Sequence, residues 1–233
     1  MLRRRRVDLR GADAEVLQVL ALQSGRPDRI RRVLDPRNPL THAVASHAIP
    51  LLGMDAVAAD AVRCLQAVAE QHAGKLVDTL LDPLQSAKAR RRVARVLSAC
   101  RSQRAADGLL LGVADSDRHV RRQCGRALLL VVARTPAVGI DQSAIHGVVL
   151  REAARTPLDL TLVFALLAIV HPREPILNAY RALERGDRHL RGTALEYLHG
   201  TLPPDVREAL WPHLLRGSLR RSPAARRLSS GER

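Results

Sequence analysis

Apolar side chains recur at helical spacing along most of the chain, and the pattern is clearest between Asp115 and Ala133. When residues 117–132 are placed on a helix, one stripe runs through positions i, i+4, i+8 and i+11, which are Val120, Cys124, Leu128 and Val131. Arginines occupy the other faces, at positions 118, 121, 122 and 126. The oxygens of Asp115, Ser116 and Asp117 suit the free N–H groups of a helix N-terminus. The pattern predicts an amphipathic helix that begins at Asp117.

The same pattern returns seventy residues later. The sequence DRHLR at 187–191 repeats DRHVR at 117–121, and each is followed by a small apolar-face residue (Cys124 or Ala194) and then a leucine (Leu128 or Leu198). A small residue in the apolar stripe lets a neighbouring helix approach closely. A spacing of seventy equals two units of about 35 residues, which is typical of helical repeat proteins.

Helical periodicity, interrupted by proline, glycine and aspartate, divides the rest of the chain into short segments that fall in pairs. The segments expected to be helical are 12–24, 27–34, 41–52, 56–71, 74–81, 86–100, 104–113, 117–133, 142–154, 158–170, 175–185, 187–198 and 205–215. Aromatic residues are limited to Phe164, Tyr180, Tyr197 and Trp211. A core of Leu, Val and Ala favours closely packed helices over a β-sandwich or barrel. We predict an all-α fold.

The unit made of a helix at 104–113, a turn containing aspartate and a helix from 117 resembles a HEAT repeat. The resemblance implies an α-solenoid of about five HEAT-like helical pairs in a right-handed superhelical stack, with a C-terminal capping helix that carries Trp211. In that family, an aspartate and a basic residue form a ladder between adjacent repeats. The residues that match it here are Asp117 with Arg121, and Asp187 with Arg191.

Three phrases carry a narrower resemblance: SQRAADGLLLGV at 102–113, VRRQCGRAL at 120–128 and HLRGTALEYLHGTLPPDVREALWPHL at 189–214. They are similar to the soluble HEAT region that follows the membrane segments in bacterial transporter-like proteins related to major-facilitator and ATP/ADP-translocase carriers. The likeness runs from about Asp28 to Leu214. It implies a non-catalytic cytosolic region that binds or regulates. The chain departs from the family in a short link between Ala154 and Leu158, and in having no apolar run beyond the 11 residues from Leu160 to Val170, where about 20 would cross a bilayer.

Basic charge gathers at the two ends of the chain. The formal net charge is +15, of which residues 1–10 contribute +4 and residues 216–233 contribute +5. We therefore expect a basic disordered segment at 1–11, a repeat domain at 12–215 and a disordered arginine- and serine-rich tail at 216–233. The basic ends offer contacts to an anionic membrane surface or to nucleic acid, and the expected location is cytoplasmic or peripheral to the inner membrane.

If the second helix of each pair lines the inner face of a stack, six arginines form one candidate binding strip: Arg90, Arg91, Arg95, Arg118, Arg122 and Arg188. A protein partner, nucleic acid and an anionic lipid surface would each be attracted to such a strip. Simple solvation of arginine on a helix exterior is the alternative. We expect a scaffold for protein–protein interaction, with nucleic-acid binding as the second hypothesis.

Catalytic chemistry has little support in the residue pattern. His42 and His47 lie five positions apart, which does not match the i, i+4 spacing of a helical zinc motif. Cys64, Cys100 and Cys124 show no CxxC spacing and are expected to be buried free thiols. HEAT-like DNA glycosylases are the remote enzymatic alternative, but they need aromatic residues beside a catalytic carboxylate. We expect no enzyme activity, metal, cofactor or small-molecule substrate.

Overall fold

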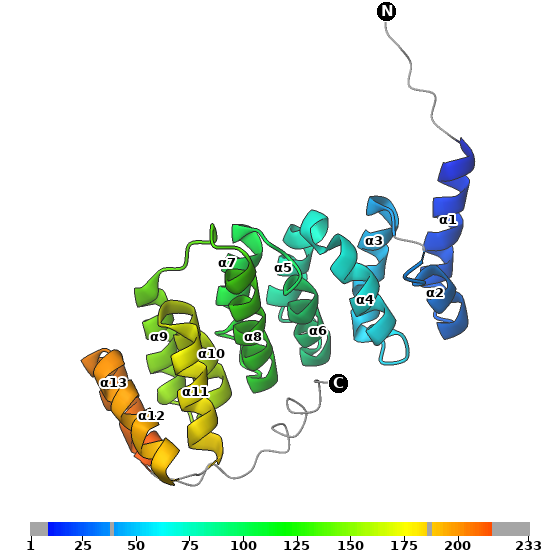
Figure 1. Cartoon of the computed structure of the whole chain (residues 1–233). Coiled ribbons are helices and arrows are strands. Elements are labelled where there is room, and N and C mark those ends of the chain that lie inside the picture. Colours follow the sequence, from blue (N-terminus) through cyan, green and yellow to red (C-terminus); the bar gives the residue numbers. More distant parts are fainter. Residues whose placement is uncertain (1–8, 38–39, 186–187, 216–233) are drawn as a thin grey trace, which may run out of the picture. The chain divides into compact units, whose positions relative to one another are not determined.

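The computed structural model describes residues 9–37, 40–185 and 188–215. Every regular element in these ranges is a helix, so the predicted all-α class is confirmed (Figure 1). The chain divides into two compact units, Met1–Gly139 (unit 1) and Ile140–Arg233 (unit 2), a division that the sequence analysis does not make. The predicted terminal segments lie outside the described residues, except that helix α1 already begins at Leu9.

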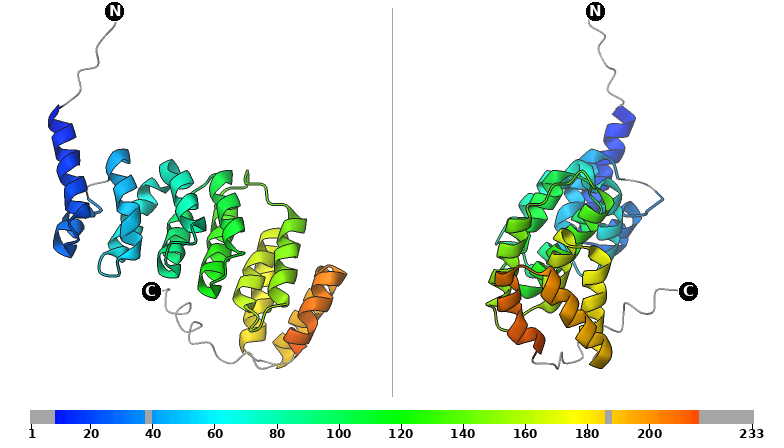
Figure 2. Two further views of the ribbon diagram at one scale, coloured as in Figure 1. Left: turned by 180° about the vertical axis from the view of Figure 1, so that it is seen from behind. Right: turned by 60° about the vertical axis from the view of Figure 1, so that its left-hand side comes forward.

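Unit 1 consists of helices joined by short turns. They are α1 (Leu9–Gln23), α2 (Pro27–Val33), α3 (His42–Ala48), the 3-10 helix η1 (Ile49–Gly53), α4 (Ala58–Val68), the 3-10 helix η2 (Ala69–His72), α5 (Ala73–Leu81), α6 (Ala87–Leu97), α7 (Gln103–Gly112) and α8 (Arg118–Arg134). Helix α5 packs against α6, and α7 packs against α8. Helices α5 and α7 lie beside each other in one layer, and α6 lies between α4 and α8 in the other (Figure 2). Two layers of helices result, and we call α2, α4, α6 and α8 the second helices.

Side-chain caps explain where several helices begin. The Asp117 carboxylate accepts hydrogen bonds from the backbone N–H groups of His119 and Val120, at 2.8 and 3.0 Å. Burial opposes ionisation of Asp117, but these two bonds leave the pKa of its carboxyl lowered. Ser86 caps α6 in the same way, through the N–H of Ala89. The predicted cap at Asp117 is therefore confirmed, and the two caps place α6 and α8 in a common register 31 residues apart.

The predicted apolar stripe of α8 forms part of the core of unit 1. Val120, Cys124, Leu128 and Val131 are each 0% exposed. All three cysteines are buried free thiols, as the sequence predicts, and Cys64 donates its S–H to the carbonyl of Leu34 at 3.0 Å. Burial raises the pKa of the Cys100 thiol to about 12. These thiols therefore behave as small apolar residues of the core.

Two glycines of α7 allow helices to pack more closely than side chains would permit. A Cβ on Gly108 would lie 2.3 Å from a methyl carbon of Val77 in α5, and one on Gly112 would lie 2.7 Å from Sγ of Cys124 in α8. Helix α7 thus fits between its two neighbours by presenting bare backbone to each. The apolar pattern at 104–113 predicts the helix that holds both glycines but does not reveal this role.

Unit 2 is built around a helix that is buried along most of its length. Its elements are α9 (Gln142–Ala153), α10 (Leu160–Val170), α11 (Arg173–Arg185), α12 (Arg188–Thr201) and α13 (Pro204–Leu215). Helix α10 packs against α9 and α11, and its Phe164 ring lies 5.0 Å from the ring of Tyr180. Ala194 and Leu198, the predicted counterparts of Cys124 and Leu128, are also buried. Trp211 of α13 is partly exposed and meets the ring of His199 edge-on.

Candidate interaction surface on the second helices

The predicted arginine strip is divided by the structure. Five of its members lie in unit 1, on α6 and α8, which pack against each other: Arg90, Arg91, Arg95, Arg118 and Arg122. Arg188 begins α12 of unit 2, and its side chain lies outside the described part of the chain. Arg95 is exposed, and Arg91, Arg118 and Arg122 are partly exposed. The structure thus brings together two pairs of surface arginines, on neighbouring helices, rather than a strip of six.

Arg90 has a different environment from the one the sequence predicts. Its guanidinium lies 3.0 Å from the Asp115 carboxylate, and the two side chains are only 12% and 7% exposed. The sequence prediction puts Arg90 on the outside of α6. Arg90 instead lies three residues before Val93 and seven before Leu97, on the buried face of α6, and the acidic turn before α8 supplies its carboxylate partner. Arg90 is therefore an internal ion-pair partner, and its expected place on an open binding face is corrected.

Asp115 joins three parts of unit 1. One carboxylate oxygen accepts the backbone N–H of Asp117 at 2.7 Å, and the other pairs with Arg90 of α6. Its backbone carbonyl accepts a hydrogen bond from Arg121 at 3.0 Å, and Arg121 also donates to the carbonyl of Ser116. Arg121 is 4% exposed. The turn before α8 is thus held by Arg90 of α6 and by Arg121 of α8 itself.

Asp117 and Arg121, one of the two pairs expected to form a ladder, make separate contacts in the structure. Arg90 and Arg121 occupy the same register, four residues after the caps Ser86 and Asp117. Arg90 pairs with the carboxylate of Asp115 in the turn before α8, whereas Arg121 binds carbonyls of that turn and Asp117 serves as the cap. Asp187 lies outside the described residues, while Arg191 donates to the Leu214 and Leu215 carbonyls at the end of α13. A basic side chain at that position suits a helix C-terminus.

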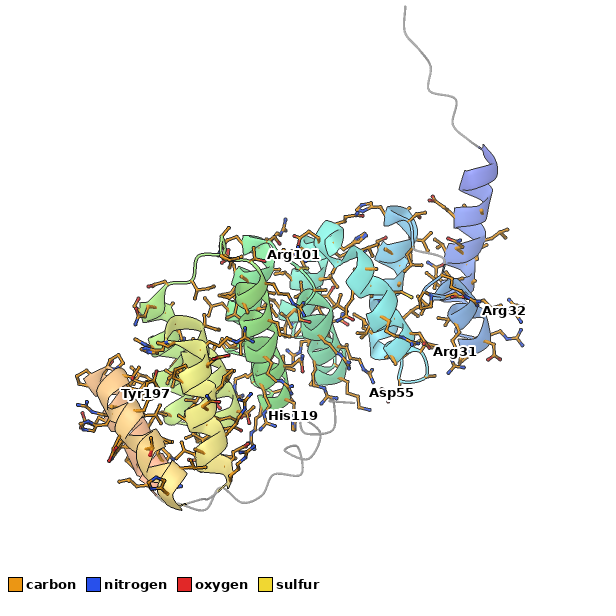
Figure 3. The ribbon with its side chains drawn as sticks, in the orientation of Figure 1. Arg31, Arg32, Asp55, Arg101, His119 and Tyr197 are labelled. Atoms are coloured by element: carbon orange, nitrogen blue, oxygen red, sulfur yellow. The ribbon has the colours of Figure 1, made fainter. Side chains whose placement is uncertain are left out.

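Further ion pairs connect α2 with α4, and α6 with the turn before α4 (Figure 3). Lys88 and Arg92 of α6 both reach back to Asp55, in the turn before α4, at 2.9 and 2.5 Å. Arg31 of α2 lies 3.5 Å from Asp60 of α4 and donates to the carbonyl of Ala56. Successive second helices are therefore connected through acidic residues that lie before or within the first turn of α4 or just before α8.

The Asp55 pair predicts a pH dependence of stability. Hydrogen bonds from Lys88 and then Arg92 lower the pKa of Asp55 to about 2. Because the unfolded-state pKa lies near 3.9, the stabilisation is present above about pH 4 and is lost as the pH falls through about 2. We expect Asp55→Asn to lower the midpoint of urea unfolding at pH 5, with the difference from wild type disappearing near pH 2.

The control for this experiment is Glu196→Gln, which removes an exposed carboxylate of α12. It should leave the difference from wild type small at every pH. If the midpoint of urea unfolding of Asp55→Asn stays below that of wild type by the same amount from pH 5 to pH 2, the charge of Asp55 does not contribute to stability. That result would contradict the role given to the Asp55 ion pairs.

The arginines that remain at the surface of α6 and α8 occupy equivalent positions. Arg91 and Arg122 are each five residues after their caps, and Arg95 and Arg126 are each nine residues after them. Arg126 is exposed and was not among the predicted site residues, although its 31-residue spacing from Arg95 was visible in the sequence. We call Arg91, Arg95, Arg122 and Arg126 the α6–α8 basic surface. Two parallel pairs of guanidinium groups of this kind suit carboxylate or phosphate partners.

Comparisons with known proteins do not assign the chain to a family. No protein-family model matches it, and no curated protein matches it in sequence. In the described ranges, no helix combines the length and the apolar character needed to span a bilayer. The same ranges contain no group of three or more His, Cys, Asp or Glu side chains arranged to hold a metal ion.

Proposed function

We propose that the chain is a non-catalytic HEAT-like α-solenoid, of about five helical pairs, which serves as a scaffold for protein–protein interaction. The 31-residue register of α6 and α8 and the contacts between successive second helices support the repeat architecture. In repeat proteins each unit contacts its neighbours and leaves an extended surface for partners. The arrangement of unit 1 fits that description.

The observation that supports this proposal most directly is that the arginines of α6 and α8 fall into a buried set and a surface set. Arg90 and Arg121 are turned into the structure, whereas the four members of the α6–α8 basic surface recur in register on its exterior. Packed helix axes lie about 8–10 Å apart, so an acidic segment could cross both helices and meet a guanidinium pair on each. We propose that the partner is a protein with an acidic segment or patch.

Two other partners remain open. The same surface could bind the phosphates of nucleic acid, although scarce aromatic residues leave few platforms for stacking bases. The basic ends, 1–10 and 216–233, could bind an anionic membrane, and the phrase at 189–214 resembles a region attached to transporter-like membrane proteins. That resemblance is the reason to look for the partner beside a membrane protein.

A matched pair of variants tests the proposal. One replaces Arg91, Arg95, Arg122 and Arg126 with serine; the other makes the same charge change at four exposed arginines of unit 2, which are Arg151, Arg173, Arg181 and Arg185. Affinity capture at 150 mM salt, followed by mass spectrometry, should recover the same partner with wild type and with the unit 2 variant. Capture by the first variant should be reduced at least about tenfold, since each charged hydrogen bond contributes about 1.5–3 kcal/mol.

Titration with a DNA or RNA duplex at 50 and 200 mM salt distinguishes nucleic-acid binding from binding of a protein partner. Nucleic-acid binding through six or more phosphate contacts would weaken by about 10³-fold over this range. If nucleic-acid binding shows this salt dependence, and is lost in the α6–α8 variant but kept in the unit 2 variant, nucleic-acid binding would replace the protein-scaffold proposal. Equal capture of the protein partner by both variants would show that the α6–α8 basic surface does not bind that partner.

A further inference from the structure

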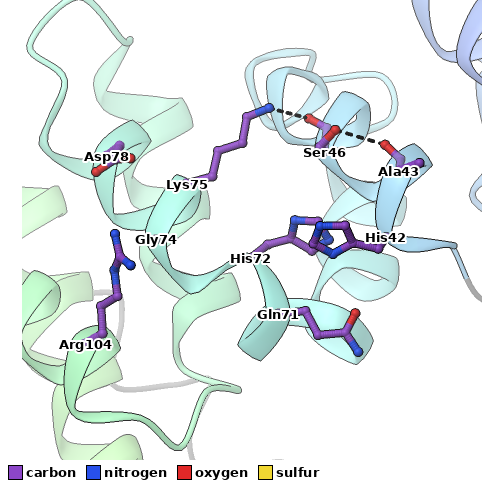
Figure 4. A pocket seen from close by; sticks show the side chains of 9 residues that line it. All are labelled: His42, Ala43, Ser46, Gln71, His72, Gly74, Lys75, Asp78 and Arg104. Atoms are coloured by element: carbon purple, nitrogen blue, oxygen red, sulfur yellow. Dashed lines mark hydrogen bonds between the residues drawn. The ribbon is translucent and has the colours of Figure 1, made fainter.

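A second group of basic side chains lies in the other helical layer of unit 1, where it lines an open pocket. The pocket has a volume of about 420 Å³ and is formed by α3, η2, α5 and the start of α7 (Figure 4). Its titratable lining consists of His42 from α3, His72 from η2, Lys75 and Asp78 from α5, and Arg104 from α7. Pockets of this size accommodate small organic molecules.

His72 is the buried polar group of this pocket. Its side chain is 5% exposed, and its ring stacks on the ring of His42 with centroids 4.4 Å apart. Its Nε2 atom is buried and has no hydrogen-bond partner in the described part of the chain. Burial, followed by the nearby His42 and Lys75, lowers the pKa of His72. A neutral imidazole with an unpaired buried nitrogen is costly, and a ligand that pairs with it removes that cost.

Two cationic side chains from different helices, Lys75 and Arg104, line the same pocket and have few hydrogen-bond partners. Lys75 makes one long hydrogen bond, of 3.4 Å, to the carbonyl of Ser46. The Arg104 guanidinium crosses the backbone of Gly74, where a Cβ would lie 2.6 Å from its Cζ atom. Arg104 forms no hydrogen bond or ion pair with the residues that the structure describes. Glycine at position 74 therefore admits this side chain to the first turn of α5, next to the pocket.

We propose that this pocket binds a small phosphate monoester, with the phosphate between Lys75 and Arg104 and the buried His72 imidazole as an additional hydrogen-bond donor. Two cationic side chains match the two charges of a phosphate monoester better than the single charge of a carboxylate. The Asp78 carboxylate, on the same helix as Lys75, accepts a hydrogen bond from a hydroxyl group in the rest of the ligand. The site is separate from the α6–α8 basic surface, so neither proposal depends on the other.

Charge linkage gives the binding a definite pH dependence. A dianion beside His72 favours the protonated imidazole, and by linkage the protonated imidazole favours the dianion. The other titratable groups facing this ring are His42 from α3, Lys75 and Asp78 from α5, and Arg104 from α7. Binding of sulfate, which remains a dianion between pH 6 and pH 7.5, therefore tightens as the pH falls.

The test uses the full chain and follows the imidazole NMR signals, assigned with a His72→Gln variant. Titration with sulfate, and separately with glucose 6-phosphate, should shift the His72 and His42 signals, and sulfate should bind more tightly at pH 6 than at pH 7.5. Lys75→Ala and Arg104→Ala remove exposed side chains and should each weaken binding of glucose 6-phosphate by at least about tenfold. Arg101→Ala, which removes an exposed arginine outside the pocket lining, should change binding less than about twofold.

The outcomes separate specific binding from general attraction to a basic protein. Equal weakening in Lys75→Ala, Arg104→Ala and Arg101→Ala, or unshifted His72 signals at 50 mM sulfate, would overturn the proposal. Vesicles containing phosphatidic acid form a second arm, since this lipid presents the same phosphate monoester. Binding of glucose 6-phosphate assigns the pocket to a free metabolite, and binding of the vesicles alone, lost in Lys75→Ala, assigns it to a lipid headgroup.

Discussion

Asp115→Ala is expected to destabilise unit 1 by about 4 kcal/mol, because it leaves a buried guanidinium without its counter-ion. Arg90 is 12% exposed, and its Nε atom already has no partner among the described residues. The same substitution removes the acceptor for the backbone N–H of Asp117 at the start of α8. Urea unfolding, followed by far-UV circular dichroism, should show a lower midpoint and a similar slope.

A double-mutant cycle provides the control for this result. Arg90→Met replaces the guanidinium by an apolar side chain of similar length, and the Asp115→Ala, Arg90→Met double variant no longer contains a buried unpaired charge. Its destabilisation should be smaller than the sum of the two single effects by at least about 1 kcal/mol. Additive effects, or a loss below about 1 kcal/mol for Asp115→Ala alone, would show that the pair contributes little.

Gly108→Leu is expected to cost about 3 kcal/mol or more, since it forces α7 away from α5. Even the Cβ atom would lie 2.3 Å from Val77, and a full leucine side chain has no space at this contact. Overpacking of a filled core typically costs about 1–3 kcal/mol, and here the two helices must separate along their length. The midpoint of thermal or urea unfolding measures the loss.

The control distinguishes packing from helix propensity. Gly192 lies within α12, and nothing lies within 4 Å of a Cβ placed there. Gly192→Ala should stabilise unit 2 by up to about 1 kcal/mol, which is the usual gain for this change inside a helix. A stable Gly108→Leu variant would show that the close approach at α7 does not limit packing. Destabilisation by Gly192→Ala would show that open space at a helical glycine is not enough to make the substitution favourable.

The sequence predicts the helices of this protein well because their determinants are local. The stripe of Val120, Cys124, Leu128 and Val131 and the cap at Asp117 both depend on residues within a few turns of one another, and the structure confirms them. The segment 41–52, expected as a helix bent or ended around Pro50, divides into α3, which ends at Ala48, and the 3-10 helix η1, with Pro50 near the start of η1. Proline restricts its own turn, and tertiary packing decides which kind of helix follows.

The candidate sites depend on partners distant in sequence, which is why the sequence predicts them only in part. The place of Arg90 on the buried face of α6 follows from helical spacing, but its ion-pair partner Asp115 is 25 residues further on and cannot be found from local spacing. The pocket brings together His42, His72 and Arg104 from three separate elements, and no local spacing connects them. The role of Gly108 is likewise invisible until Val77 is placed against it. The 31-residue register is a long-range signal in the sequence beside the seventy-residue repeat, and it would have added Arg126.

The distribution of sulfur gives the chain a set of built-in reporters. Cys64 belongs to α4, Cys124 belongs to α8 and Cys100 lies just after the end of α6, so the thiols mark three places in unit 1, and all are shielded from solvent. A thiol reagent can attack them only after the surrounding helices open, because the thiolate must form and become accessible. The rate at which each cysteine is alkylated in native buffer therefore measures how often the helices around it separate, without any added label.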